Sequence, residues 1–167
     1  MRNRIRIVAV AILLFVGAGV SADSPGSLKV QNLSELSSAA IEKSLPILLI
    51  MSASDCKYCE LLKDEIIAPM LKSGLYQEKV IIREFMIDGD VTVTDFDQTK
   101  TDPRKVSSRY DVVVTPTILF LDPYGFQIED RIVGAGNVEF ASHYIDKSVD
   151  SAFQSVRKST YLSSQQN

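Results

Sequence analysis

Two cysteines are the residues of this 167-residue chain whose type and spacing point most directly to chemistry. They are Cys56 and Cys59, and only Lys57 and Tyr58 separate them. The chain-entropy treatment of disulfides assigns about 2 kcal/mol of stabilisation to so short a loop, against about 5 kcal/mol for a loop of 100 residues. Because the pair constrains the chain so little, we expect it to serve a chemical purpose, the closing and reopening of a disulfide.

A strand and a helix are expected to position this pair. Residues 46–51 are continuously apolar, as in a strand buried on both faces. Apolar residues then recur at helical spacing over residues 61–70, which predicts a helix that begins near Cys56. The free N–H groups and the dipole at the start of a helix favour a thiolate at Cys56. Cys59 lies one turn further in and is more shielded, so we expect Cys56 to attack and Cys59 to resolve.

The first 22 residues contain the only long apolar run. Three arginines precede apolar residues 7–20, and small residues follow at 20–22. This pattern is typical of a secretory signal cleaved after Ala22. An uncleaved membrane anchor is the alternative, although about 14 apolar residues are short for a span of about 20. Cleavage leaves 145 residues and, because three arginines are lost, changes the formal charge from −3 to −6. We therefore expect a periplasmic protein.

The composition narrows the possible partners. The chain has 18 Lys and Arg against 21 Asp and Glu, with a pI near 5.2, so no basic surface suits nucleic acid. The length fits one domain. We expect a linker at residues 23–32, a domain at 33–158 and a polar tail at 159–167.

The remaining elements follow from local patterns. A helix is expected at 33–44 with Ser34 as a possible N-cap, and another from 103 to 110 opened by Asp102. Strands are expected at 79–87, at 117–121 and, antiparallel to the latter across a turn at 122–125, at 126–133. Asn137 should cap a final helix whose apolar residues are Phe140, Tyr144, Ile145, Val149 and Phe153.

This order of elements resembles the thioredoxin fold over residues 33–158. Residues 114–117 (Val-Thr-Pro-Thr) resemble the cis-proline turn of that family, Gly134 matches the glycine after its last strand, and residues 67–71 resemble its proline-kinked active-site helix. The resemblance implies an α/β domain with a central mixed sheet of four to five strands flanked by helices. It also implies that Thr115 and Pro116 lie against the cysteines.

Within that fold, the chain resembles the exported thioredoxin-like proteins of sulfur-oxidation gene clusters, the SoxW type. The shared segments are Cys56-Lys57-Tyr58-Cys59, residues 93–97 (Val-Thr-Asp-Phe-Asp) and residues 115–117. The resemblance implies a monomer that exchanges thiols and disulfides with exported proteins, mainly as a reductant. It implies a membrane electron carrier as the source of electrons and no cofactor besides the disulfide. Lys57 and Tyr58 are expected to support the site.

One departure from the family concerns proton transfer. Thioredoxins carry a buried acid six residues before the first cysteine, and that position is Ile50 here. Either another acid such as Glu84 serves Cys59, or water alone does.

Metal binding is the competing interpretation. A Cu(I) chaperone could use the same two cysteines, although zinc and copper sites usually need more soft ligands. His143 on the final helix is expected to be a surface residue. Four aspartates between residues 88 and 97 do not match the spacing of an EF-hand loop. We assign no metal ligand, and expect the acidic insertion at 89–102 to be a solvated loop or a docking segment.

Overall fold

A four-stranded mixed sheet forms the centre of the fold. The computed structural model describes residues 28–165 except 135 and 137, so the expected signal at 1–22 and the expected cap Asn137 lie outside the described residues. The strands are β1 (Ile47–Ser52), β2 (Ile81–Met86), β5 (Thr117–Leu121) and β6 (Ile132–Val133), in the order β2-β1-β5-β6. Strand β1 is parallel to β2 and antiparallel to β5. The expected mixed α/β architecture is confirmed.

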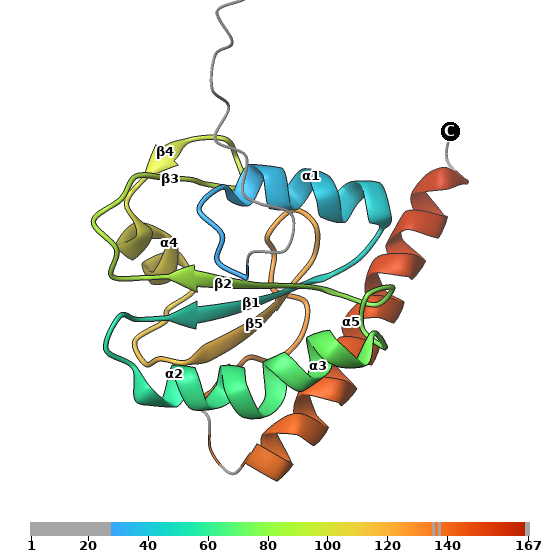
Figure 1. Ribbon diagram of the computed structural model, residues 1–167. Helices are drawn as coiled ribbons and strands as arrows, with labels where there is room; N and C mark the ends of the chain where they lie inside the picture. Colours follow the sequence, from blue (N-terminus) through green and yellow to red (C-terminus); the bar gives the residue numbers. More distant parts are fainter. Residues whose placement is uncertain (1–27, 135, 137, 166–167) are drawn as a thin grey trace, which may run out of the picture.

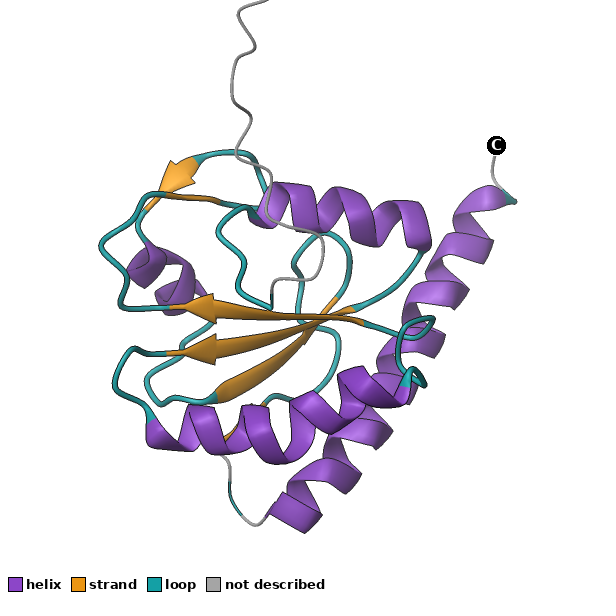
Figure 2. Ribbon diagram, viewed as in Figure 1, coloured by secondary structure: helices purple, strands orange, loops and turns teal. Residues whose placement is uncertain are grey.

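Helices cover both faces of this sheet (Figures 1 and 2). Helices α1 (Leu33–Lys43) and α4 (Pro103–Arg109) lie on one side. Helices α2 (Lys57–Leu62), α3 (Ala68–Ser73) and α5 (Val138–Ser164) lie on the other. All six residues of β1 are buried, because alternate side chains enter the two cores. In the described part of the chain, no helix combines the length and hydrophobicity needed to span a bilayer.

The active-site helix is interrupted by a π-helical segment, η1 (Lys63–Ile67), between α2 and α3. The N–H of Ala68 donates to the carbonyl of Lys63, five residues earlier. Pro69 follows and has no N–H to continue the α-helical ladder, which accounts for a change of pitch here. The expected irregularity near Pro69 is therefore present, as a π turn before the proline.

The N-terminal boundary differs from the sequence expectation. Asn32 caps α1, because its side chain accepts the N–H of Glu35 at 3.2 Å, so Ser34 is not the cap. Residues 28–32 were expected in a linker, but residues 28–30 run beside β2, and residues 31 and 32 pair with Thr94 of the acidic insertion. The N–H of Val30 donates to the carbonyl of Glu84 at 2.9 Å, and the N–H of Glu84 donates to the carbonyl of Leu28 at 2.7 Å. Through these hydrogen bonds to the edge strand β2, residues 28–30 belong to the domain.

The strand expected at 126–133 is broken. Gln127 forms an isolated bridge with Leu121, and the regular pairing with β5 resumes only at β6. Between them, Glu129 accepts a hydrogen bond from the Ser151 hydroxyl of α5, and Arg131 donates to the carbonyl of Tyr110. Because Glu129 and Arg131 bond to residues outside the sheet, the backbone between Gln127 and β6 does not continue the regular pairing with β5.

Helix α5 packs on only part of the face that was expected. Phe140 and Tyr144 are exposed, whereas Ile145 and Val149 are buried as expected. Phe153 is partly buried. Small residues complete the inner face, which comprises Ala141, Ile145, Val149, Ala152 and Val156. Alanine side chains let the helix pack close to the sheet. The free energy gained by this close packing exceeds what burial of the larger aromatic rings would contribute. The helix also continues to Ser164, into the expected tail, and His143 on it is exposed.

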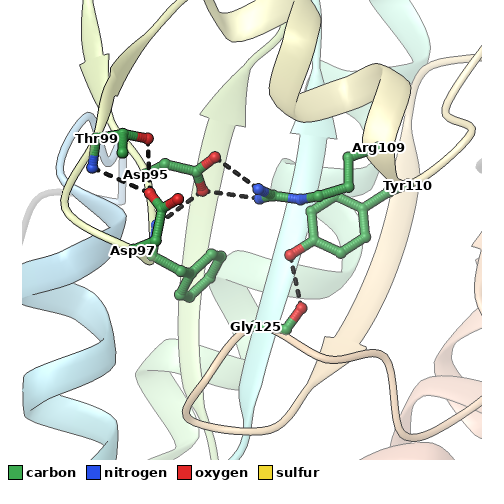
Figure 3. Close-up of polar contacts among 7 residues, drawn as sticks. Asp95, Asp97, Thr99, Arg109, Tyr110 and Gly125 are labelled. Atoms are coloured by element: carbon green, nitrogen blue, oxygen red, sulfur yellow. Dashed lines mark hydrogen bonds and ion pairs between the residues drawn. The ribbon is translucent and has the colours of Figure 1, made fainter.

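The acidic insertion forms a hairpin that is anchored to α4 (Figure 3). Its strands are β3 (Val93–Thr94) and β4 (Lys100–Thr101). The carboxylate of Asp95 is buried and accepts two hydrogen bonds from the Arg109 guanidinium, at 2.6 and 2.7 Å. These bonds raise the pKa of Arg109. The expectation of a solvated loop is therefore wrong for Asp95, whose distant cation the sequence could not reveal.

A tyrosine ties the loop before β2 to α5. The Tyr76 hydroxyl donates to Asp146 at 2.5 Å, and burial together with this carboxylate raises the pKa of Tyr76 to about 12. We expect Tyr76→Phe to lower the free energy of unfolding by about 1 kcal/mol at pH 7. A raised folded pKa stabilises the fold below the unfolded value of about 10, and that stabilisation is lost as the pH rises through 12. Urea unfolding of both proteins should therefore show a difference at pH 7 that shrinks by pH 11. A difference that grows between those values would contradict this assignment.

Candidate active site

Cys56 and Cys59 are joined by a disulfide, with their Cα atoms 5.2 Å apart. Cys56 is the N-cap of α2, and its Sγ accepts the N–H of Cys59 at 3.2 Å. Cys56 is partly exposed, whereas Cys59 is only 1% exposed. The expected helix start and the expected shielding of Cys59 are both confirmed. A partner molecule can therefore reach Cys56 but not Cys59.

A cis-proline turn lies against the accessible sulfur. The Thr115–Pro116 peptide bond is cis, as the family resemblance implies. The hydroxyl of Thr115 donates to Cys56 Sγ at 3.4 Å, and Gly134 donates its N–H to the carbonyl of Pro116 at 2.7 Å. Residues from three distant parts of the chain thus meet at one end of the sheet, and they include the expected site residues Thr115 and Pro116.

The surface around Cys56 is open and partly apolar. Tyr58 is 54% exposed, and Lys57 Nζ lies 5.1 Å from the centre of its ring. Val113 and Val114, next to the cis-proline turn, are also exposed. A shallow depression of about 560 Å³ beside the sulfur is lined by Ala53, Asp55, Cys56, Lys57, Tyr58, Asp88 and Thr115.

A carboxylate at the end of β2 fixes the active-site loop. Asp88 Oδ2 accepts the N–H of Ser54 at 2.8 Å. This hydrogen bond lowers the pKa of Asp88 below its usual value, against the opposing effect of burial. Asp88 therefore remains ionised at neutral pH and holds the loop that precedes Cys56.

A buried ion pair lies beneath the active-site helix. Glu84 is 2% exposed and lies opposite Ile50 in the β1–β2 register. Its Oε1 is 3.0 Å from Lys63 Nζ, which also lies 2.7 Å from Glu60 Oε1. Burial lowers the pKa of Lys63, but the nearby carboxylates of Glu60 and Glu84 outweigh this effect and raise it. The acid missing at Ile50 thus has a counterpart on the neighbouring strand.

The sequence identified some of these groups and missed others. Glu84 was a candidate, because it is an acid within an apolar strand pattern. Lys63 was missed, although its position four residues after Cys59 places both on one side of a helix. Asp88 had no local signal, since its partner Ser54 lies 34 residues away. Among the described residues, no three or more His, Cys, Asp and Glu side chains gather as a metal site.

Comparison with solved structures finds thioredoxins among those similar to this chain. Similar solved structures are poplar thioredoxin h, mitochondrial thioredoxin 3 of Saccharomyces cerevisiae and the germline thioredoxin Deadhead of Drosophila melanogaster. Their identities to this chain are 21%, 17% and 16%, with TM-scores of 0.45, 0.47 and 0.48. The matches cover 67%, 72% and 71% of this chain and 84%, 94% and 96% of those chains.

No curated protein matches the chain. A family model described as a thioredoxin-like domain matches residues 33–147, well over half of the sequence. That segment runs from the start of α1 into α5, and contains both cysteines and the cis-proline turn. On this match, the chain belongs to the thioredoxin-like domain family.

Proposed function

We propose that this protein is a periplasmic thiol–disulfide oxidoreductase that reduces disulfides in exported proteins. The thioredoxin-like domain with a Cys-x-x-Cys pair supports the general activity. The observation that carries the proposal is the asymmetry of the pair. Cys56 is reachable at a helix N-terminus and Cys59 is buried one turn inside, as nucleophilic attack followed by internal resolution requires.

The catalytic cycle starts from the reduced pair. The Cys56 thiolate attacks one sulfur of the substrate disulfide, and the other substrate sulfur leaves as a thiolate. Cys59 then loses its proton and attacks Cys56 Sγ, which releases the second substrate thiolate. Two electrons pass to the substrate, and the Cys56–Cys59 disulfide forms, which is the state of the pair in this structure.

Renewal of the cycle needs a dithiol reductant. Because the two thiols carry both electrons, no further cofactor is required. We assign the reductant to a membrane electron carrier, in keeping with the resemblance of the motifs to the SoxW type. The signal-like segment at residues 1–22 supports export to the periplasm. The acidic balance makes nucleic acid an unsuitable partner, and we propose that the protein acts as a monomer.

The surface around Cys56 suits an extended segment of a substrate protein. The exposed side chains of Tyr58, next to Cys56 in the motif, and of Val113 and Val114, just before the cis-proline turn, can offer apolar contacts. Lys57 adds a positive charge beside the departing thiolate. Thr115 can donate its hydroxyl to Cys56 Sγ, as its 3.4 Å contact shows.

Disulfide reduction by the purified chain tests the proposal. Supplied with dithiothreitol, the protein should accelerate the reduction of insulin disulfides well above the rate with dithiothreitol alone. Its reduction potential should lie near the roughly −270 mV of thioredoxin, as expected of a reductant. A potential near the roughly −120 mV of DsbA would overturn the assigned direction of electron flow. Stoichiometric Cu(I) binding with no exchange activity would replace the proposal with a soft-metal chaperone.

A further inference from the structure

Two carboxylates line the depression beside Cys56. Asp55 precedes Cys56 in the loop between β1 and α2, and Asp88 follows the end of β2. Because β1 and β2 are parallel, these two segments leave the sheet at the same end (Figure 1). The depression, about 560 Å³ in volume, therefore receives one acid from the end of each strand. Both acids lie next to the sulfur that a substrate must reach.

The charges of these two carboxylates are incompletely compensated. The Asp55 side chain is exposed and forms no hydrogen bond or ion pair within the described residues. Asp88 Oδ2 accepts the N–H of Ser54, but its Oδ1 is covered and has no hydrogen-bond partner in that part of the chain. The bond from Ser54 lowers the pKa of Asp88, so this group is ionised at neutral pH. The depression is therefore favourable for a cation.

The nearest basic side chains contact other groups. Lys57 Nζ lies 5.1 Å from the centre of the Tyr58 ring and forms no ion pair with either aspartate of the depression. Arg104, at the start of α4, lies 3.5 Å from Asp90 and 3.6 Å from Asp102. The charge of Arg104 is therefore shared between two further acids, and the surface around the depression keeps an excess of negative charge.

An aromatic ring lines the same depression. Tyr58 is 54% exposed, and the position of Lys57 shows that its ring already accommodates a cation. Carboxylates and aromatic faces are the groups that bind guanidinium and ammonium ions in proteins. Arginine suits this combination better than lysine, because its planar guanidinium can stack on a ring while its N–H groups donate to a carboxylate.

We infer that Asp55, Asp88 and Tyr58 select substrates whose disulfide lies in a basic segment, with an arginine beside the reacting cysteine. This inference rests on the proposed function and names the substrate class of the same site. The guanidinium occupies the depression while Cys56 attacks the neighbouring sulfur. A segment with acidic residues in those positions is disfavoured by repulsion between like charges.

Single-turnover kinetics with three peptides test the inference. The peptides share one disulfide and differ only in the residues that flank its cysteines, which are Arg, Gln or Glu. At low ionic strength, the reduced full chain should reduce the Arg peptide about tenfold faster than the Glu peptide, since each exposed charge pair changes an affinity by up to about fivefold. The Gln peptide should react at an intermediate rate. In about 0.5 M sodium chloride, the Arg-to-Glu ratio should fall to about threefold, because salt screens exposed charges.

The ratio of the two rates separates selection from reactivity. Loss of Asp55 also changes the charge beside the Cys56 thiolate, and loss of Asp88 releases the Ser54 N–H, but these effects act on every peptide alike and cancel in the ratio. Asp55→Asn should lower the ratio about threefold, and Asp55→Asn combined with Asp88→Asn should bring it below about twofold. Glu78→Gln is the matched control, because it removes one exposed negative charge at the opposite end of β2 and should preserve the ratio.

Two outcomes overturn the inference. One is an Arg-to-Glu ratio below about twofold in the unmodified protein at low ionic strength. The other is a ratio that the double variant retains. Failure of the unmodified protein to reduce any of the three peptides would instead overturn the proposed function.

Discussion

Cys59→Ser is expected to convert the protein into a trap for its substrates. Cys56 remains partly exposed at the start of α2 and can still attack a disulfide, but the second sulfur that would release the product is gone. The mixed disulfide should therefore accumulate to one equivalent per chain, and turnover should fall by at least about a thousandfold. Mass spectrometry of the intact adduct, with peptide mapping of the linked cysteine, gives the measurement.

The matched control is Cys56→Ser. It leaves Cys59 as the only thiol of the chain, and Cys59 is buried, so a substrate disulfide cannot reach it. We expect neither adduct nor turnover from this variant. An adduct on Cys59, or equal trapping by both variants, would contradict the assigned roles of attacking and resolving cysteine.

Gly125→Ala is expected to destabilise the domain by about 3 kcal/mol, although it lies in a turn remote from the cysteines in sequence. Gly125 has a φ of +88°, which costs an alanine about 1 kcal/mol. An added Cβ would also lie 2.6 to 2.9 Å from three carbons of the Phe96 ring, and such overpacking costs typically 1–3 kcal/mol. The Tyr110 hydroxyl holds the Gly125 carbonyl at 2.7 Å, so the turn cannot easily move away (Figure 3).

Gly134→Ala provides the control for backbone strain. Gly134 has a similar φ of +79°, but nothing lies within 4 Å of its added Cβ. It should cost only about 1 kcal/mol. Urea unfolding of both variants, and of Gly125→Ala combined with Phe96→Leu, measures the difference. If the smaller side chain at position 96 does not recover part of the loss, the ring contact is not its cause.

The elements set by local chemistry could be predicted from the sequence. Asp102 and Pro103 begin α4 as expected, because the Asp102 side chain accepts the N–H of Arg104 and proline is favourable at the first helical position. Cys56 begins α2 for similar local reasons. The resemblance to the thioredoxin fold implied that the cis-proline turn lies against the first cysteine, and the contact of the Thr115 hydroxyl with Cys56 Sγ agrees with this.

The features that depend on distant partners could not be predicted. Asp95 gave no sign that it would be buried, since Arg109 becomes its partner only when the hairpin docks on α4. Hydrophobicity favoured Phe140 as a core residue of α5, but the neighbouring Ala141 faces the sheet. Both outcomes depend on how elements approach one another in space, which a periodic pattern does not encode.

The segment that runs beside β2 has a consequence for the behaviour of the protein at high concentration. Strand β2 is one edge of the sheet, and an unpaired edge can pair with the same edge of another molecule. The backbone of Leu28 and Val30 occupies the hydrogen-bonding groups of Glu84 at the middle of that edge. At the opposite edge, β6 is only two residues long. Within the described residues, neither edge therefore offers a long free strand, which protects the domain against edge-to-edge aggregation.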